Sequence, residues 1–257
     1  MDNNKIRIVM LCVNGQSSRI MFNDLATYAN VECVIIEEKP SSILMIQRRV
    51  KNLGMIKTSG QLLFLIINKL LAKTSQNRIK QLISNYGLND ESFPNDLIRN
   101  VASINSEEVI SLLKSINPDA VVVNGTRIIS KSVLSSVDAP FINTHMGITP
   151  RYRGVHGGYW ALANGDSDNC GVTVHLVDPG IDTGGVLYQD TIHTDNCDNF
   201  NTYPIHQIAK GIQLMKAALN DVKEKRVNVK QGVFPSQLWY HPTIFEYVKH
   251  WIQKGVR

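Results

Sequence analysis

Short apolar runs alternate with amphipathic stretches along most of the chain. Residues 6–13 form an apolar run that ends at Asn14-Gly15, as a buried strand followed by a turn would read. The next stretch has apolar positions at helical spacing, and a second apolar run follows at residues 31–36. A strand, a helix and a strand at this spacing favour a right-handed parallel unit, and therefore an α/β sheet.

The same alternation resumes after Pro94. Residues 106–116 have helical periodicity with two glutamates at their start, and residues 120–123 are the β-branched run of a strand buried on both faces. Further strands are expected at 141–143 and 171–177, and a further helix at 205–222. The pattern predicts an α/β protein with a Rossmann-like, mostly parallel sheet flanked by helices.

Residues 40–92 interrupt this alternation with apolar, basic segments and with turns expected near Gly54, Gly60 and Gly87. We interpret them as a helical insertion within a main domain of residues 1–230. The remaining residues, 231–257, are rich in aromatic side chains and are expected to pack on that domain as a C-terminal tail. A homodimer contact is the alternative role for this tail.

Positive charge is concentrated in the insertion. Nine Lys or Arg residues and no acidic residue lie between Lys39 and Lys80, in a chain whose net charge is +5. This segment is either a solvated basic face or a surface that attracts an anionic partner, such as a phosphorylated substrate, a nucleic acid or an acidic membrane. Charge alone does not choose between these interpretations.

Composition excludes several other classes of protein. The four cysteines are widely spaced, which argues against a zinc ribbon or a disulfide scaffold and fits a reducing cytoplasm. The N-terminus does not have the pattern of a signal peptide, and no run reaches the roughly 18 uninterrupted apolar residues of a membrane span. The seven histidines lack the spacing of a zinc-protease helix, so we expect a cytoplasmic protein without a membrane span or a metal site.

Polar residues and glycines gather between residues 124 and 190, at the ends of predicted strands, where α/β sheets bind ligands. Asn143 and His145 are two positions apart on one strand, so their side chains project to the same face. Asp182 lies in a glycine-rich loop. An amide and an imidazole can stabilise an oxyanion while a carboxylate assists proton transfer, which suits acyl transfer to an amine without a covalent intermediate.

Each of these three residues has a simpler explanation when it is considered alone. An Asn-x-His pair is more often structural, and a single aspartate among glycines is usually a turn residue. Their order and context carry the functional interpretation. The chain also lacks a Gly-x-Ser-x-Gly nucleophile elbow, so a side-chain nucleophile is not expected.

Four motifs occur in order: Asn-Thr-His at 143–145, Ile-Thr-Pro-Arg-Tyr-Arg-Gly at 148–154, Gly-Val-Thr at 171–173, and Asp-Pro-Gly-Ile-Asp-Thr-Gly at 178–184. Together they resemble the formyltransferase family, which includes glycinamide ribonucleotide, methionyl-tRNA and sugar-nucleotide N-formyltransferases. The resemblance is strong over residues 117–190, weaker over 5–36, and absent over the insertion and the tail.

The resemblance implies a catalytic domain that uses N10-formyltetrahydrofolate as co-substrate and no metal. It places Asn143, His145 and Asp182 at the family's catalytic positions. The folate pocket would be lined by Arg127, Ile128, Ile129, Val177, Asp178 and Gly180. The acceptor would contact Met146, Gly147, Tyr152 and Arg153, and also Gly15 and Ser17 if their turn binds a phosphate rather than only joining a strand to a helix.

The acceptor is less defined than the reaction. Glycinamide ribonucleotide enzymes are usually shorter and lack the insertion, and methionyl-tRNA enzymes carry a C-terminal barrel for which the residues after Leu187 are too few. We therefore expect a small, phosphorylated or nucleotide-linked amine, with an amino-deoxysugar nucleotide first, and not a nucleic acid. The alternatives are phosphoribosylglycinamide formyltransferase, formyltetrahydrofolate hydrolase and a non-catalytic folate-binding protein.

Overall fold

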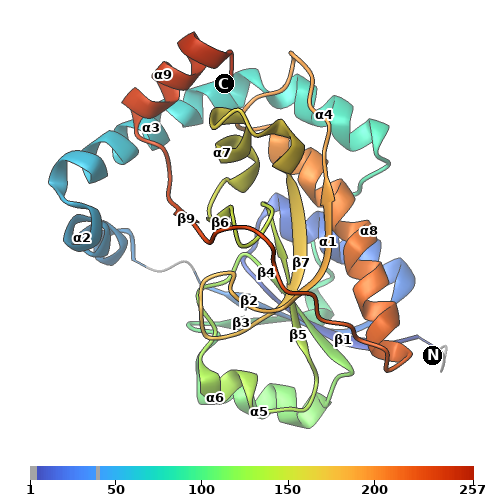
Figure 1. Cartoon of the computed structure of the whole chain (residues 1–257). Helices are drawn as coiled ribbons and strands as arrows, with labels where there is room; N and C mark the ends of the chain where they lie inside the picture. Colours follow the sequence, from blue (N-terminus) through green and yellow to red (C-terminus); the bar gives the residue numbers. More distant parts are fainter. Residues whose placement is uncertain (1–4, 39–40) are drawn as a thin grey trace.

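The protein is described by a computed structural model that covers residues 5–38 and 41–257 (Figure 1). Lys39 and Pro40, at the start of the predicted basic insertion, lie outside the described residues. The centre of the molecule is a seven-stranded sheet with the order β3-β2-β1-β4-β5-β7-β8. Its strands are β1 (Arg7–Cys12), β2 (Asn30–Glu37), β3 (Ile98–Val101), β4 (Ala120–Asn124), β5 (Phe141–His145), β7 (Gly171–Leu176) and β8 (Val186–Thr191).

The prediction of a mostly parallel, Rossmann-like sheet is confirmed. The first five strands in the sheet order pair in parallel, whereas β7 pairs antiparallel with both β5 and β8. Strands β3 and β8 were not predicted from the sequence. Both are edge strands that expose polar side chains, so neither has the continuous apolar run that marked the central strands.

Helices cover both faces of the sheet. Helices α1 (Gln16–Tyr28) and α8 (Tyr203–Lys223) pack on one face, and α5 (Glu107–Ile116) and α6 (Lys131–Leu134) on the other (Figure 1). Successive residues of β1 point to opposite faces and join two separate hydrophobic cores. The remaining short elements are η1 (Asn95–Leu97), β6 (Arg153–Gly154), α7 (Gly157–Ala163), η2 (Ser167–Asn169) and β9 (Leu238–Trp239).

The predicted insertion contains three helices: α2 (Ser42–Leu53), α3 (Met55–Thr74) and α4 (Gln76–Asn85). Gly54 turns the chain between α2 and α3 with a φ of 80°, as expected. The turn predicted at Gly60 is wrong, because Gly60 lies inside α3, where an added Cβ atom would be 3.0 Å from the Thr243 side chain. The glycine therefore permits close packing against the segment that leads into the last helix.

That last helix, α9 (Ile244–Lys254), lies alongside α3 (Figure 1). It begins with a capping box between Thr243 and Glu246. The rings of Tyr247 and Phe64 are 5.1 Å apart, which joins the aromatic tail to the insertion. By length and composition alone, α3 could cross a membrane, but such evidence is weak, and 22% of that window is buried inside the protein.

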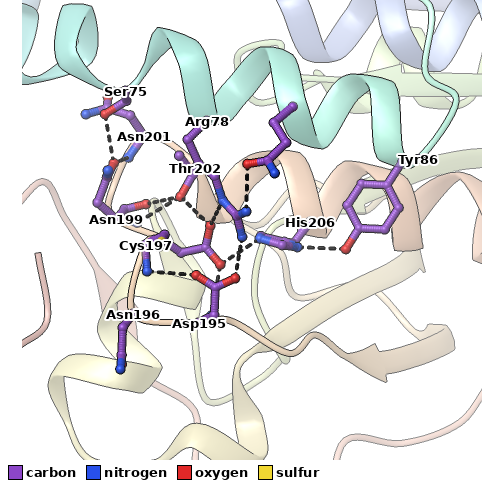
Figure 2. A network of polar contacts seen from close by, with 12 residues as sticks. Ser75, Arg78, Tyr86, Asp195, Asn196, Cys197, Asn199, Asn201, Thr202 and His206 are labelled. Atoms are coloured by element: carbon purple, nitrogen blue, oxygen red, sulfur yellow. Dashed lines mark hydrogen bonds and ion pairs between the residues drawn. The ribbon is translucent and has the colours of Figure 1, made fainter.

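A polar network fixes α4 to the body of the protein (Figure 2). Arg78 of α4 lies 3.0 Å from one oxygen of the fully buried carboxylate of Asp198. The other oxygen lies 2.9 Å from Nε2 of His206. The other ring nitrogen of His206 lies 2.7 Å from the hydroxyl of Tyr86. Burial would raise the pKa of Asp198, but its contacts with His206 and Arg78 outweigh burial and hold that pKa well below its ordinary value.

Candidate active site

A cavity of about 960 Å³ lies at the carboxyl ends of the parallel strands, where α/β proteins bind ligands. Its volume is near the upper end of the usual range for small-molecule sites. The lining includes the ends of β4 and β5, the loop at 125–129, the segment at 175–182, and residues of helix α2 and of the segment at 238–241.

Asn143 faces His175 from the neighbouring strand, because the two residues are register partners in the β5–β7 pair. Nδ1 of His175 lies 2.7 Å from the carbonyl oxygen of Leu176, which only accepts, so Nδ1 carries the proton. Nε2 of His175 then accepts a hydrogen bond from the Asn143 amide at 3.1 Å. This contact orients the amide of Asn143 and uses one of its two N–H bonds.

His145 lies between two acceptors. Its Nδ1 atom is 3.2 Å from the carboxylate of Asp182, and its Nε2 atom is 2.6 Å from the backbone carbonyl of Tyr152. Asp182 has a φ of 50°, and one of its oxygens accepts the backbone N–H of Gly154 at 2.9 Å. A neutral imidazole has one N–H and can donate to only one of the two acceptors, whereas the protonated ring donates to both.

The surroundings shift the pKa values of this pair. Burial would raise the pKa of Asp182, but the nearby His145 and the Gly154 N–H act against burial, and the pKa falls to about 2. Burial lowers the pKa of His145, and Asp182 and the Tyr152 carbonyl act in the opposite direction. Asp182 is therefore ionised at neutral pH, and it offsets only part of the effect of burial, which keeps the pKa of His145 below its ordinary value.

The predicted folate-side residues Arg127, Ile128, Ile129, Val177, Asp178 and Gly180 all line the cavity. Arg127 forms an ion pair with the buried carboxylate of Glu37 at 2.5 Å, and Glu37 also accepts the backbone N–H of Ile104. The loop at 125–129 is thus fixed to the end of β2. The sequence analysis missed Glu37, which directly follows the apolar run at residues 31–36.

Two of the six predicted acceptor-side residues line the cavity, and four do not. Ser17 and Met146 line the cavity, whereas Gly15, Gly147, Tyr152 and Arg153 are outside its lining. Tyr152 is a core residue, because it is 1% exposed and its hydroxyl donates to Asp166. Arg153 donates from its side chain to the Ile181 carbonyl, next to Asp182.

Gly147 has a packing role that explains its position. A Cβ atom there would lie 2.4 Å from the Tyr152 carbonyl oxygen and 2.9 Å from Nε2 of His145. The glycine therefore leaves room for the contact that holds the imidazole. The sequence analysis assigned this residue to acceptor binding, but its location supports the geometry of His145.

Several cavity residues come from segments that sequence reasoning did not connect with the site. Arg48 and Arg49 reach it from α2, and Gln61 from α3. His156 and His241 also line it, with 2.9 Å between their ring nitrogens. Burial lowers the pKa of His156 to about 3 and that of His241 to about 4, so both are neutral near pH 7. Apart from the turn at Gly15 and Ser17, only the basic composition of the insertion had pointed to an anionic ligand.

Comparison with known proteins agrees with this arrangement. The family model described as formyl transferase matches residues 42–218, which is more than half of the chain. The chain belongs to the formyl transferase family. The match includes the helical insertion, over which no resemblance was expected from the motifs. Within residues 5–38 and 41–257, no cluster of three or more His, Cys, Asp or Glu side chains has the arrangement of a metal site.

Curated relatives in sequence include methionyl-tRNA formyltransferases. The chain is 42% identical to that of Finegoldia magna over 95 residues, which cover 37% of this chain and 30% of the relative. It is 28% identical to that of Caldanaerobacter subterraneus over 147 residues, which cover 57% of this chain and 47% of the relative. The matched region thus spans less than half the length of these relatives.

Solved structures with the same fold include a sugar N-formyltransferase from Shewanella, with a TM-score of 0.56, 15% identity, and coverage of 91% of this chain and 76% of the other. A glycinamide ribonucleotide transformylase from Symbiobacterium toebii has a TM-score of 0.57 and 16% identity, with 90% and 93% coverage. At these identities the likeness concerns the fold alone.

Proposed function

We propose that the chain transfers the formyl group of N10-formyltetrahydrofolate to the primary amine of a small anionic acceptor, with an amino-deoxysugar nucleotide first among the candidates. One observation carries this proposal. Asn143, His145 and Asp182 lie in a single cavity that has the loop at 125–129 on one side and the arginines of α2 on another. The cysteine content is consistent with action in a reducing cytoplasm.

The reaction follows from what each side chain can donate or accept. The amine nitrogen attacks the formyl carbon, a C–N bond forms, and the carbonyl oxygen becomes an oxyanion. The second N–H of Asn143 is available to that oxyanion, because the first is bonded to His175. His145 adds a donor once its Nε2 atom leaves the Tyr152 carbonyl.

Proton transfer completes the exchange. The ionised Asp182, directly or through water, accepts the proton that the attacking amine loses. The oxyanion then re-forms the carbonyl, the bond from the formyl carbon to N10 breaks, and N10 takes up the proton held by Asp182, directly or through water, as tetrahydrofolate leaves. Asp182 also orients the ring of His145, so loss of its charge affects both steps.

The acceptor side of the cavity is basic and polar. Arg48 and Arg49 line it, and guanidinium groups bind phosphate oxygens in bidentate geometry. This supports a phosphorylated or nucleotide-linked amine. Charged initiator tRNA is the second candidate acceptor, because the sequence relatives are methionyl-tRNA formyltransferases and residues 41–80 contain no acidic residue.

The direct test is a panel of acceptors incubated with purified protein and N10-formyltetrahydrofolate, with tetrahydrofolate release and product mass as readouts. The panel contains 3-amino- and 4-amino-deoxysugar nucleotides, glycinamide ribonucleotide, charged initiator tRNA and a control without amine. Formylation of a sugar nucleotide supports the proposal. Formylation of the charged initiator tRNA alone would show that the acceptor is the tRNA and not a sugar nucleotide. Tetrahydrofolate release in the control without amine, with no formylated product in any incubation, reassigns the chain to hydrolysis. Asn143→Ala serves as the matched inactive variant.

A further inference from the structure

The α2–α3 hairpin carries large apolar side chains on its outside. Helix α2 has 12 residues and buries none of them, and Ile56 at the start of α3 is 92% exposed. An isolated helix of about this length is marginal in water, so α2 needs a surface to cover it. The outer apolar face consists of Met55, Ile56, Leu63, Ile66 and Leu70 on the hairpin, with Phe245, Trp251 and Ile252 on α9. Helix α2 adds the exposed Ile43, Leu44, Met45 and Ile46, which are consecutive and therefore project around the helix rather than to one side.

Helix α3 has two distinct faces. Ile56, Leu63, Ile66 and Leu70 recur at spacings of three, four and seven residues and therefore share one side of the helix, which is exposed. Phe64, on the other side, is fully buried and packs against Phe200 with their ring centroids 5.0 Å apart. One side of α3 thus belongs to the body of the protein and the other has no cover within the described residues.

The hairpin and α9 present their exposed apolar side chains together. A second cavity, of about 500 Å³, lies where α2, α3 and α9 meet, and Met55, Ile56 and Phe245 all line it. On α9, Phe245 and Ile252 are 77% and 78% exposed and lie seven residues apart, on one side of that helix. In Figure 1 this region forms the margin of the molecule farthest from α5 and α6.

The charges around this surface are mostly positive. Residues 41–80 contain eight Lys or Arg residues and no acidic residue, and Lys57, Lys69 and Lys73 are exposed on α3 itself. Glu246 of α9 lines the second cavity, and its carboxylate accepts the backbone N–H of Thr243 in the capping box. Apolar side chains, an aromatic residue and flanking lysines together are the composition of a helix that binds at a membrane interface.

We propose that the outer apolar face docks onto a lipid surface that carries anionic head groups, with α2, α3 and α9 lying along that surface rather than across it. A spanning arrangement conflicts with Phe64 in the core and with Asn68, whose side chain is bonded to that of Asn201 at 2.9 Å. Pairing of the same face on two copies would bring like charges together. The exposed isoleucines and leucines have no role in binding a polar nucleic acid.

Docking would also position the catalytic cavity. Leu53 lines both cavities, and Arg48 and Arg49 of the same helix line the larger one. The part of the larger cavity that α2 lines would therefore lie next to the lipid head groups. The docking itself does not depend on formyl transfer. Membrane binding can therefore be absent in an active formyltransferase, and it can be present even if the proposed activity is not found.

The test is flotation of the full chain with vesicles of phosphatidylcholine alone or of equal parts phosphatidylcholine and phosphatidylglycerol. The protein should bind the anionic vesicles at low salt and be released by high salt, because screening weakens attraction between surface charges. Lys57→Glu/Lys69→Glu/Lys73→Glu should reduce partitioning about tenfold or more. Ile56→Asp/Leu63→Asp should reduce it by a similar factor, because apolar side chains must enter the interface.

Matched substitutions on other surfaces control for charge and folding. Lys114→Glu on α5 and Val233→Asp, at a side chain that is 86% exposed, should bind vesicles like the parent chain. Circular dichroism and the thermal unfolding midpoint show whether each variant is folded. Equal binding to neutral and anionic vesicles, or undiminished binding by folded Ile56→Asp/Leu63→Asp, would overturn the proposal. So would a stable dimer in sedimentation velocity that this double variant abolishes, because the face would then be a subunit interface.

Discussion

Nδ1 of His145 lies 3.2 Å from Oδ2 of Asp182, although the two residues belong to a strand and to a loop that are separated by 37 positions. The same carboxylate oxygen accepts the backbone N–H of Gly154. These contacts hold a charged group at the floor of the cavity and set the orientation of the imidazole beside Asn143. The consequences can be tested by substitution.

Asp182→Asn should lower kcat by about 10²–10³, the range found when a preorganised polar group at a reacting centre is lost. The amide keeps the shape of the side chain but removes the charge that favours proton uptake by His145. Steady-state kinetics with saturating folate measures the loss. Asp168→Asn, on an exposed residue of η2, is the matched control, and parental turnover by Asp182→Asn would contradict the mechanism.

His175→Ala should lower kcat more than it changes the KM for either substrate. His175 fixes the amide of Asn143 through a 3.1 Å hydrogen bond, so its loss leaves the oxyanion donor present but free to rotate. We expect a reduction of about tenfold, smaller than that of Asn143→Ala, which should reach about 10²–10³. The double variant Asn143→Ala/His175→Ala should be no slower than Asn143→Ala, because His175 acts through Asn143. Additive losses would show an independent role for His175.

Gly147→Ala should reduce kcat strongly although residue 147 is outside the cavity lining. The added methyl group would meet the Tyr152 carbonyl oxygen at 2.4 Å and Nε2 of His145 at 2.9 Å, so the backbone or the imidazole must move. A misplacement of about 1 Å near the reacting atoms can cost 10²-fold in rate. Kinetics together with the thermal unfolding midpoint separates displacement of His145 from unfolding. Full activity in a folded variant would exclude this role of Gly147.

His156 should make the free energy of unfolding depend on pH. Burial holds its folded pKa at about 3, whereas an exposed histidine titrates near 6.5, so below pH 6.5 the unfolded chain binds more protons. Its contribution to stability is therefore present above pH 6.5 and is lost as pH falls towards 4. Urea unfolding should show a smaller loss over that interval for His156→Asn, since asparagine tolerates the left-handed φ of 58°. An unchanged pH slope would rule out this linkage.

Arg48→Glu/Arg49→Glu should raise the KM for an anionic acceptor by at least about tenfold and leave the KM for the folate nearly unchanged. Both side chains line the side of the cavity that is formed by α2, and reversal of their charge repels phosphate. Lys51→Glu, on the same helix but outside the cavity lining, is the control. An effect of equal size from Lys51→Glu would assign the basic segment to general attraction rather than to the site.

The local pattern of apolar and polar residues was sufficient to predict the central strands and the ends of α5. The apolar runs at 6–13 and 120–123 became the central strands β1 and β4, because a strand covered on both faces must be apolar at successive positions. Helix α5 begins after Ser106, whose side chain caps it, and ends at Asn117, which has a left-handed backbone conformation. Both signals depend only on residues that are close in the sequence. The edge strands β3 and β8 had no such signal.

The site shows the same division. The sequence by itself determined the formyl transferase motifs, and it placed Asn143 and His145 on one face because side chains alternate along a strand. Tertiary structure alone decided that His175 faces Asn143, that Arg48 and Arg49 join the cavity, and that Tyr152 is a core residue. The physical reason is that strand pairing and helix packing bring together residues far apart in the chain, and no local pattern records which ones meet.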